Sequence, residues 1–67
     1  MPISARNKIK GTVTKITRGE AIANVEIDAN GLRLVASITV EAANDLGLSE
    51  GTEVTAIIKA SDVLVAT

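Results

Sequence analysis

The sequence contains no cysteine, histidine, phenylalanine, tyrosine or tryptophan among its 67 residues. Without cysteine it can form no disulfide, and without cysteine and histidine it lacks the usual ligands of a structural zinc ion. Aromatic side chains usually supply much of the apolar area in small cores, and a domain of this length buries only about 60% of its unfolded surface. We therefore expect one small domain that depends on oligomerisation for part of its stability.

The missing residue types also exclude functions. General acid–base and nucleophilic catalysis need groups such as histidine, cysteine or a carboxylate pair, and no convincing carboxylate pair is present, so we expect no enzyme. Seven basic and eight acidic residues give a net charge of −1 and are spread along the chain, unlike a general polyanion binder. Met1-Pro2-Ile3 lacks a signal-peptide pattern, and no apolar run approaches the roughly 20 residues that span a bilayer. We expect a cytoplasmic protein without a nucleic-acid or membrane partner.

What is present is aliphatic: 46% of the chain is hydrophobic. Short runs rich in β-branched or alternating apolar residues predict five strands, at 8–17, 21–28, 32–38, 52–59 and 62–66. In the first run the apolar side shifts between Val13 and Ile16, which indicates a bulge. Asn30-Gly31 is typical of a type I′ hairpin turn.

A short helix is predicted between the third and fourth strands. Thr39 can cap its N-terminus, residues 40–46 carry apolar side chains at helical spacing, and Gly47 can end it. Five strands with one helix in this position is the element order of an all-β, OB-like five-stranded β-barrel.

Several apolar residues lie on the faces opposite the expected core, namely Ile22, Val35, Ile57 and Leu64. The final run, Val63 to Ala66, is apolar on both faces. A strand that is apolar on both faces needs cover on both, and in so small a barrel the second cover is most easily another subunit.

Two stretches near opposite ends of the sequence carry side chains that bind anions. Ser4-Ala5-Arg6-Asn7 offers a hydroxyl, backbone N–H groups around a small residue and a planar guanidinium. Lys59-Ala60-Ser61 adds an ammonium and a second hydroxyl. Each stretch also has an ordinary structural explanation. Ser4 and Arg6 would belong to a solvated N-terminal arm, Lys59 would be a strand-end charge that discourages aggregation, and Ser61-Asp62 would form a simple turn. If the stretches meet, within one subunit or between two, they form a donor-only pocket for a fully ionised oxyanion, with Asn7 fixing the backbone beside it.

The chain resembles the molbindins, small molybdate-binding proteins built from a Mop domain of the TOBE/Mop family, in three motifs. These are Ser4-Ala5-Arg6-Asn7-x-Ile9-x-Gly11-x-Val13, Leu46-Gly47-Leu48-x-x-Gly51 and Ile58-Lys59-Ala60-x-x-Val63. The match covers nearly the whole chain. It implies one Mop domain over residues 1–67, an OB-like barrel, and a homo-hexamer formed as a trimer of dimers. It also implies that molybdate or tungstate binds at subunit interfaces as an oxyanion, with no cofactor and no directly coordinated metal ion.

The resemblance assigns the oxyanion-binding residues, which are Ser4, Ala5, Arg6, Lys59, Ala60, Ser61 and Thr39. The segment at Thr39 is contributed by a neighbouring subunit in related Mop domains, and the N–H groups of Thr39, Val40 and Glu41 at the helix N-terminus would favour an anion. Related domains have a hydroxyl residue three positions later, where this sequence has Ala42. The Glu41 carboxylate would repel the anion if it pointed inward.

The predicted function is binding, storage and buffering of molybdate and tungstate without chemistry. All four oxygens of these dianions accept hydrogen bonds, whereas phosphate is partly protonated at neutral pH and also needs an acceptor. One alternative is a ligand-sensing Mop-type module that acts with a transport or regulatory protein. Because the sequence begins with Met1 and carries no DNA-binding or nucleotide-binding segment, we expect a free-standing protein instead. An OB-type nucleic-acid module is the weaker alternative, since such modules use aromatic platforms and a basic groove.

Overall fold

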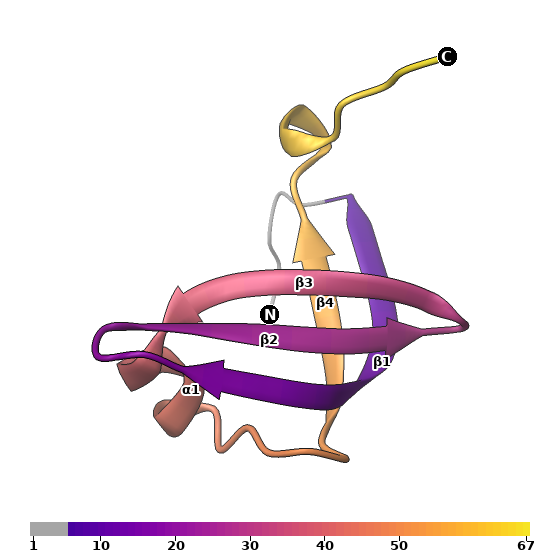
Figure 1. Ribbon diagram of the computed structural model, residues 1–67. Helices are drawn as coiled ribbons and strands as arrows, with labels where there is room; N and C mark the ends of the chain where they lie inside the picture. The colour runs from indigo at the N-terminus through magenta and orange to yellow at the C-terminus, as the bar shows by residue number, and fades with distance from the viewer. Residues whose placement is uncertain (1–5) are drawn as a thin grey trace.

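The computed structural model describes residues 6–67. Within them the chain forms strands β1 (Asn7–Arg18), β2 (Ile22–Ala29), β3 (Leu32–Thr39) and β4 (Glu53–Ile58), helix α1 (Val40–Asp45) and the 3-10 turn η1 (Ala60–Asp62). The strands pair antiparallel in the order β3-β2-β1-β4 (Figure 1). An all-β fold with a short helix between the third and fourth strands is therefore confirmed.

Strand β1 is shared between two partners and turns from one to the other. Its first half pairs with β4 and its second half with β2, and Thr12 is paired with both Glu53 and Asp28. The expected bulge is present as a register shift between Val13 and Lys15. At Gly11 a Cβ would lie 2.6 Å from the Ile27 side chain and 2.7 Å from the Asp28 carbonyl oxygen, so only glycine fits this crossing. The bend carries the two ends of β1 to distant parts of the molecule.

The β2–β3 hairpin supplies most of the core. Asn30 and Gly31 have φ angles of 57° and 86°, which confirms the type I′ turn, and the Gly31 N–H donates to the Asp28 carboxylate at 3.0 Å. The inward face of β2 is buried, and Val25 and Ile27 pack with Val13 of β1. The predicted alternation of this strand is thus confirmed.

Helix α1 begins and ends as its sequence predicts, within one residue. The Thr39 hydroxyl accepts a hydrogen bond from the Ala42 N–H at 3.0 Å, which is an N-cap. At the other end the N–H groups of Gly47 and Leu48 donate to the carbonyl oxygens of Asn44 and Ala43, the Schellman arrangement. No helix within residues 6–67 is long and apolar enough to span a membrane.

The predicted fifth strand, at 62–66, is wrong for the single chain. The chain enters η1 after β4, where the Asp62 N–H donates to the Lys59 carbonyl oxygen at 2.9 Å, and residues 63–67 form no helix or strand. Leu64 and Val65 are 94% and 90% exposed. Figure 1 shows this segment leaving the sheet. The η1 turn sends the chain away from β4 instead of back along it, so the segment meets no strand of its own chain.

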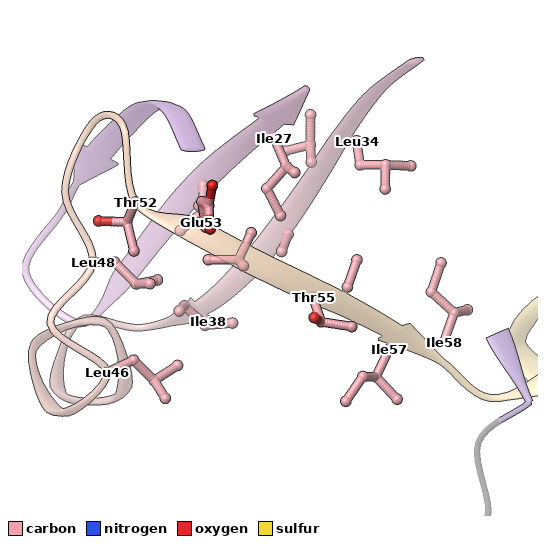
Figure 2. A pocket seen from close by; sticks show the side chains of 15 residues that line it. Ile27, Leu34, Ile38, Leu46, Leu48, Thr52, Glu53, Thr55, Ile57 and Ile58 are labelled. Carbon is pink, nitrogen blue, oxygen red and sulfur yellow. The ribbon is translucent and has the colours of Figure 1, made fainter. Parts of the chain in front are cut away.

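The place that a fifth strand would occupy is an apolar groove between β3 and β4, the two outer strands of the described sheet. Its volume is about 490 Å³. Figure 2 shows its side chains gathered around β4, with Ile38, Leu46 and Leu48 toward one end and Ile57 and Ile58 toward the other. The five-stranded barrel is therefore open on one side within the part of the chain that the structure describes.

Candidate functional site

Arg6 and Lys59 are brought to the same end of the molecule by the pairing of β1 with β4. In this antiparallel register Asn7 faces Ile58 as the last pair, and Arg6 and Lys59 each lie one residue beyond that pair, at the same end of the ladder. The Lys59 backbone is still extended, with φ −62° and ψ 140°. The two cations predicted from distant parts of the sequence are thus neighbours in one chain. Ser4 and Ala5 lie outside the described residues.

The Asn7 side chain secures this end of the ladder. Its Nδ2 donates to the Ile58 carbonyl oxygen at 3.2 Å in a partly buried position. This bond joins the residue that follows Arg6 to the residue that precedes Lys59. The expectation that Asn7 fixes the backbone is confirmed.

Ala60 and Ser61 follow Lys59 in η1, and all three residues are exposed. The Ser61 hydroxyl is therefore on the same end of the molecule as Arg6, within the turn that begins at Lys59. Asp62 belongs to the same turn and places a carboxylate nearby. The structure brings together four of the seven predicted residues: Arg6, Lys59, Ala60 and Ser61.

The electrostatics of this end favour an anion. Like charges on neighbouring strands repel each other, so Arg6 and Lys59 gain from an anion between them. The ion pair found within residues 6–67 joins Arg33 to Glu26 at 2.8 Å, far along the sheet on β2 and β3. A guanidinium, an ammonium and a hydroxyl offer donors that suit a fully ionised oxyanion, and Asp62 in the same turn is the carboxylate that opposes them. No cluster of three potential metal-ligating side chains is found among the described residues.

Thr39 lies at the other end of the molecule. It pairs with Ile22 at the end of β2 that lies beside Arg18, the last residue of β1, whereas Arg6 precedes the first residue of β1. Figure 1 shows α1, which Thr39 caps, well away from the end of β4. One chain therefore does not bring Thr39 to Arg6 and Lys59.

The surroundings of Thr39 correct the expectation of free N–H groups at the helix N-terminus for one of the three predicted groups, that of Val40. The Val40 N–H donates to the Ala21 carbonyl oxygen at 2.8 Å, and the Ala42 N–H is taken by the Thr39 hydroxyl. What Thr39 retains is its own O–H, which remains able to donate. The hollow around it is lined by three carboxylate residues, Glu20, Glu41 and Asp45. This end of the molecule alone is unfavourable for a dianion.

Sequence reasoning missed Lys8 and Lys10. The signal was their spacing, since residues two apart on a strand share a face. The exposure of β1 alternates at this point, with Lys8 and Lys10 exposed and Asn7 and Ile9 partly buried. Lys8 and Lys10 are therefore on the same side of β1 as Arg6.

The chain matches the TOBE domain over residues 3–65. It is 42% identical over 66 residues to molybdenum-pterin-binding protein 3 of Clostridium pasteurianum, covering 97% of each chain. The structure superimposes on a molybdate-binding protein from Sporomusa ovata with a TM-score of 0.97 and 42% identity, covering 100% of both chains. It also matches the cytoplasmic molybdate-binding protein ModG in its molybdate-bound form, with a TM-score of 0.86 and 46% identity over 90% of this chain and 43% of that one.

These matches extend from one end of the chain to the other and agree in sequence and in structure. The motifs at both ends of the sequence are those in which the chain resembles the molbindins. The chain therefore belongs to the TOBE-domain family, among its molbindin-type members.

Proposed function

We propose that the protein binds molybdate and tungstate non-covalently at interfaces between its own copies, and that it stores and buffers these oxyanions in the cytoplasm. The observation that carries the proposal is the register of β1 with β4, which brings Arg6 and Lys59 to the same end of the ladder. Relatives named for binding molybdate or molybdenum-pterin support the choice of ligand. The site performs no bond-making chemistry.

The donor set selects the ligand by its protonation state. Arg6 supplies a fork of N–H donors, Lys59 an ammonium, and Ser4 and Ser61 hydroxyls. Molybdate and tungstate are dianions at neutral pH and accept at all four oxygens. Phosphate carries a proton in part of its population and needs an acceptor that this set does not offer. Sulfate has the same charge and shape as molybdate, so the dimensions of the pocket must separate the two.

A second copy is needed to complete the pocket. Thr39 lies at the opposite end of the molecule from Arg6 and Lys59. The two ends carry complementary charges, because the Thr39 end has the carboxylates of Glu20, Glu41 and Asp45. When the end of one copy that holds Arg6 meets the α1 end of another, Thr39 reaches the anion from the neighbour. Ala42 supplies no hydroxyl in this arrangement, so Thr39 is the side-chain donor from α1.

The C-terminal segment gives a second reason for assembly. Residues 63–66 are apolar and exposed, while the groove between β3 and β4 is apolar and has the unpaired edge of a strand on each side. We propose that the segment of one copy enters the groove of another as the fifth strand. Backbone hydrogen bonds to an exposed sheet edge and burial of Leu64 would drive this exchange. A hexamer built as a trimer of dimers is the assembly we expect.

Calorimetric titration of the unaltered protein with molybdate, tungstate, sulfate and phosphate tests the proposal. Molybdate and tungstate should bind with similar affinity, sulfate more weakly, and phosphate weakest. Arg6→Ala and Lys59→Ala should each lower molybdate affinity by about tenfold to a hundredfold, because a hydrogen bond to a charged group contributes about 1.5–3 kcal/mol. Lys15→Ala is the matched control, since Lys15 is an exposed cation of β1 beyond the bulge.

Two results would contradict the proposal. Equal affinity for sulfate and molybdate would reduce the site to a general anion patch. Unchanged titrations for both Arg6→Ala and Lys59→Ala would mean that the oxyanion binds elsewhere.

A further inference from the structure

The outer face of the ribbon formed by β1 and β4 carries a row of cations, which we call the cationic strip: Arg6, Lys8, Lys10 and Lys59. Lys8 faces Ile57 and Lys10 faces Thr55 in the register that brings Arg6 and Lys59 to the same end of the ladder. All four residues are exposed, and residues two apart on each strand share this face. The strip thus continues from the proposed oxyanion site along β1.

The strip concentrates the positive charge of a chain that is acidic overall. It holds four of the seven basic residues, although the net charge is −1. Acidic residues lie at both ends of the strip: Asp62 follows Lys59 in η1, and Glu53 and Asp28 both face Thr12, at the end away from Arg6. The ion pair found among the described residues joins Arg33 to Glu26 and involves no residue of the strip. The four cations of the strip therefore form no ion pair within the described part of the chain.

The distance of Lys8 and Lys10 from an anion held at Arg6 determines how strongly their charges act on it. Residues two apart on a strand are separated by about 6.5–7 Å, so Lys8 is about 7 Å and Lys10 about 13 Å along β1 from Arg6. The screening length is about 8 Å at 0.15 M salt and about 30 Å at 0.01 M. Both lysines therefore act on a dianion held at Arg6 when salt is low, and Lys10 hardly acts when salt is high.

We propose that Lys8 and Lys10 raise the affinity and the association rate for oxyanions through their electrostatic field, without contacting the bound ion. The inference rests on the proposed function, because it takes Arg6 and Lys59 as the contacts. A dianion interacts with the field twice as strongly as a monoanion, so the strip also favours doubly charged ligands. The protein gains a salt-dependent affinity for molybdate that its contact residues alone would not give.

The test is calorimetric titration of the full chain with molybdate at 10, 150 and 500 mM sodium chloride. From the Coulomb energy in water at these distances, Lys8→Gln should weaken binding about fourfold at 10 mM salt and Lys10→Gln about twofold. The double variant should lose about eightfold at 10 mM, about threefold at 150 mM and less than about twofold at 500 mM salt. Glutamine keeps most of the side-chain stem, and native mass spectrometry checks that the assembly is unchanged.

Lys15→Gln is the matched control, because it removes the same charge from β1 beyond the bulge, farther along the strand from Arg6 than Lys10. It should leave molybdate affinity nearly unchanged at every salt concentration. Lys10→Glu should double the effect of Lys10→Gln, since it changes the charge by two units instead of one.

Three outcomes would overturn the inference. Equal affinities of the double variant and Lys15→Gln at 10 mM salt would show that the strip has no effect. A loss of the same size at 500 mM salt as at 10 mM would show contact instead of field. Salt-sensitive binding of a single-stranded oligonucleotide that competes with molybdate would assign the strip to nucleic acid. In each case the unaltered protein still binds molybdate; if it does not, the proposed function itself has failed.

Discussion

The two ends of this small molecule differ in charge, in chemistry and in what each lacks. The end formed by β1 and β4 holds Arg6 and Lys59 and is rich in donors. The α1 end holds Thr39 in a hollow lined by Glu20, Glu41 and Asp45. At the end formed by β1 and β4, the two cations repel each other. At the α1 end, the Thr39 hydroxyl lies among carboxylates that would repel a dianion. In the site that we propose, neither end alone is complete.

Under the function that we propose, this difference means that the fold separates the parts of the site and leaves their union to assembly. β1 is the connection: it pairs with β4 at one end and with β2 at the other, and it turns between them at Gly11 and the bulge. A flat β1 would not direct the two ends into different parts of the surface. The open groove and the exposed C-terminal segment are the structural features through which copies can join.

The largest expected effect comes from separating the copies. Leu64→Glu places a charge on the 94% exposed residue that we expect to enter the apolar groove of a partner. The assembly should dissociate or unfold, and molybdate binding should be lost with it. Size-exclusion chromatography with light scattering measures this, and Thr67→Glu, which adds the same charge after the apolar run, is the control. A Leu64→Glu oligomer of unchanged mass would contradict the interface.

The next effect comes from the bend that holds the two ends apart. Gly11→Ala should lower the free energy of unfolding by about 1–3 kcal/mol, because its Cβ would meet the Asp28 backbone, which cannot move aside as a side chain can. Denaturant titration measures the change. Gly19→Ala, where the Cβ would lie 3.1 Å from the Ile22 carbonyl oxygen, serves as the milder comparison. Equal losses of unfolding free energy in the two variants would show that the contact at Gly11 does not require glycine.

A smaller effect should come from the charge of the α1 end. Glu41→Gln should tighten molybdate binding about twofold to fourfold at low salt, because it removes a carboxylate beside Thr39 from the vicinity of a dianion. Glu50→Gln in the loop before β4 is the control with the same change of charge. Weaker binding by Glu41→Gln would show that Glu41 pairs with a cation of the neighbouring copy.

The smallest effect concerns the stability of the unliganded protein. Arg6→Ala should raise it by about 0.2–1 kcal/mol, since it removes one of two like charges that lie at the same end of the ladder. Thermal unfolding without oxyanion measures the change, and added molybdate should reverse the ranking by stabilising only the unaltered protein. A destabilised Arg6→Ala protein without ligand would argue that Arg6 has a structural partner.

Local features of the fold were predictable because each depends on a short stretch of sequence. The turn at Asn30-Gly31, the cap at Thr39 and the alternation of β2 all follow from neighbouring residues. The fifth strand was not predictable in the same way. Residues 62–66 have the composition of a strand, but a strand also needs a partner, and η1 directs these residues away from every strand of their own chain.

The candidate site shows the same limit. Arg6 and Lys59 could be predicted as anion-binding residue types, but that they lie at the same end of the ladder depends on the register of β1 with β4. The N–H groups at the start of α1 looked suitable from the sequence, yet Val40 and Ala42 use theirs within the chain. The position of Lys8 and Lys10 on the same face as Arg6 could have been predicted from the sequence, because side chains two residues apart on a strand share a face.

Native mass spectrometry of the protein titrated with molybdate tests the central claim most directly, because one spectrum reports both the assembly and the number of bound ions. We expect an oligomer, with molybdate retained on the oligomer and absent from any monomer peak. Arg6→Ala should give the same oligomer without the bound ion. A well-folded monomer that carries molybdate would contradict the account, since its site would then lie within one chain.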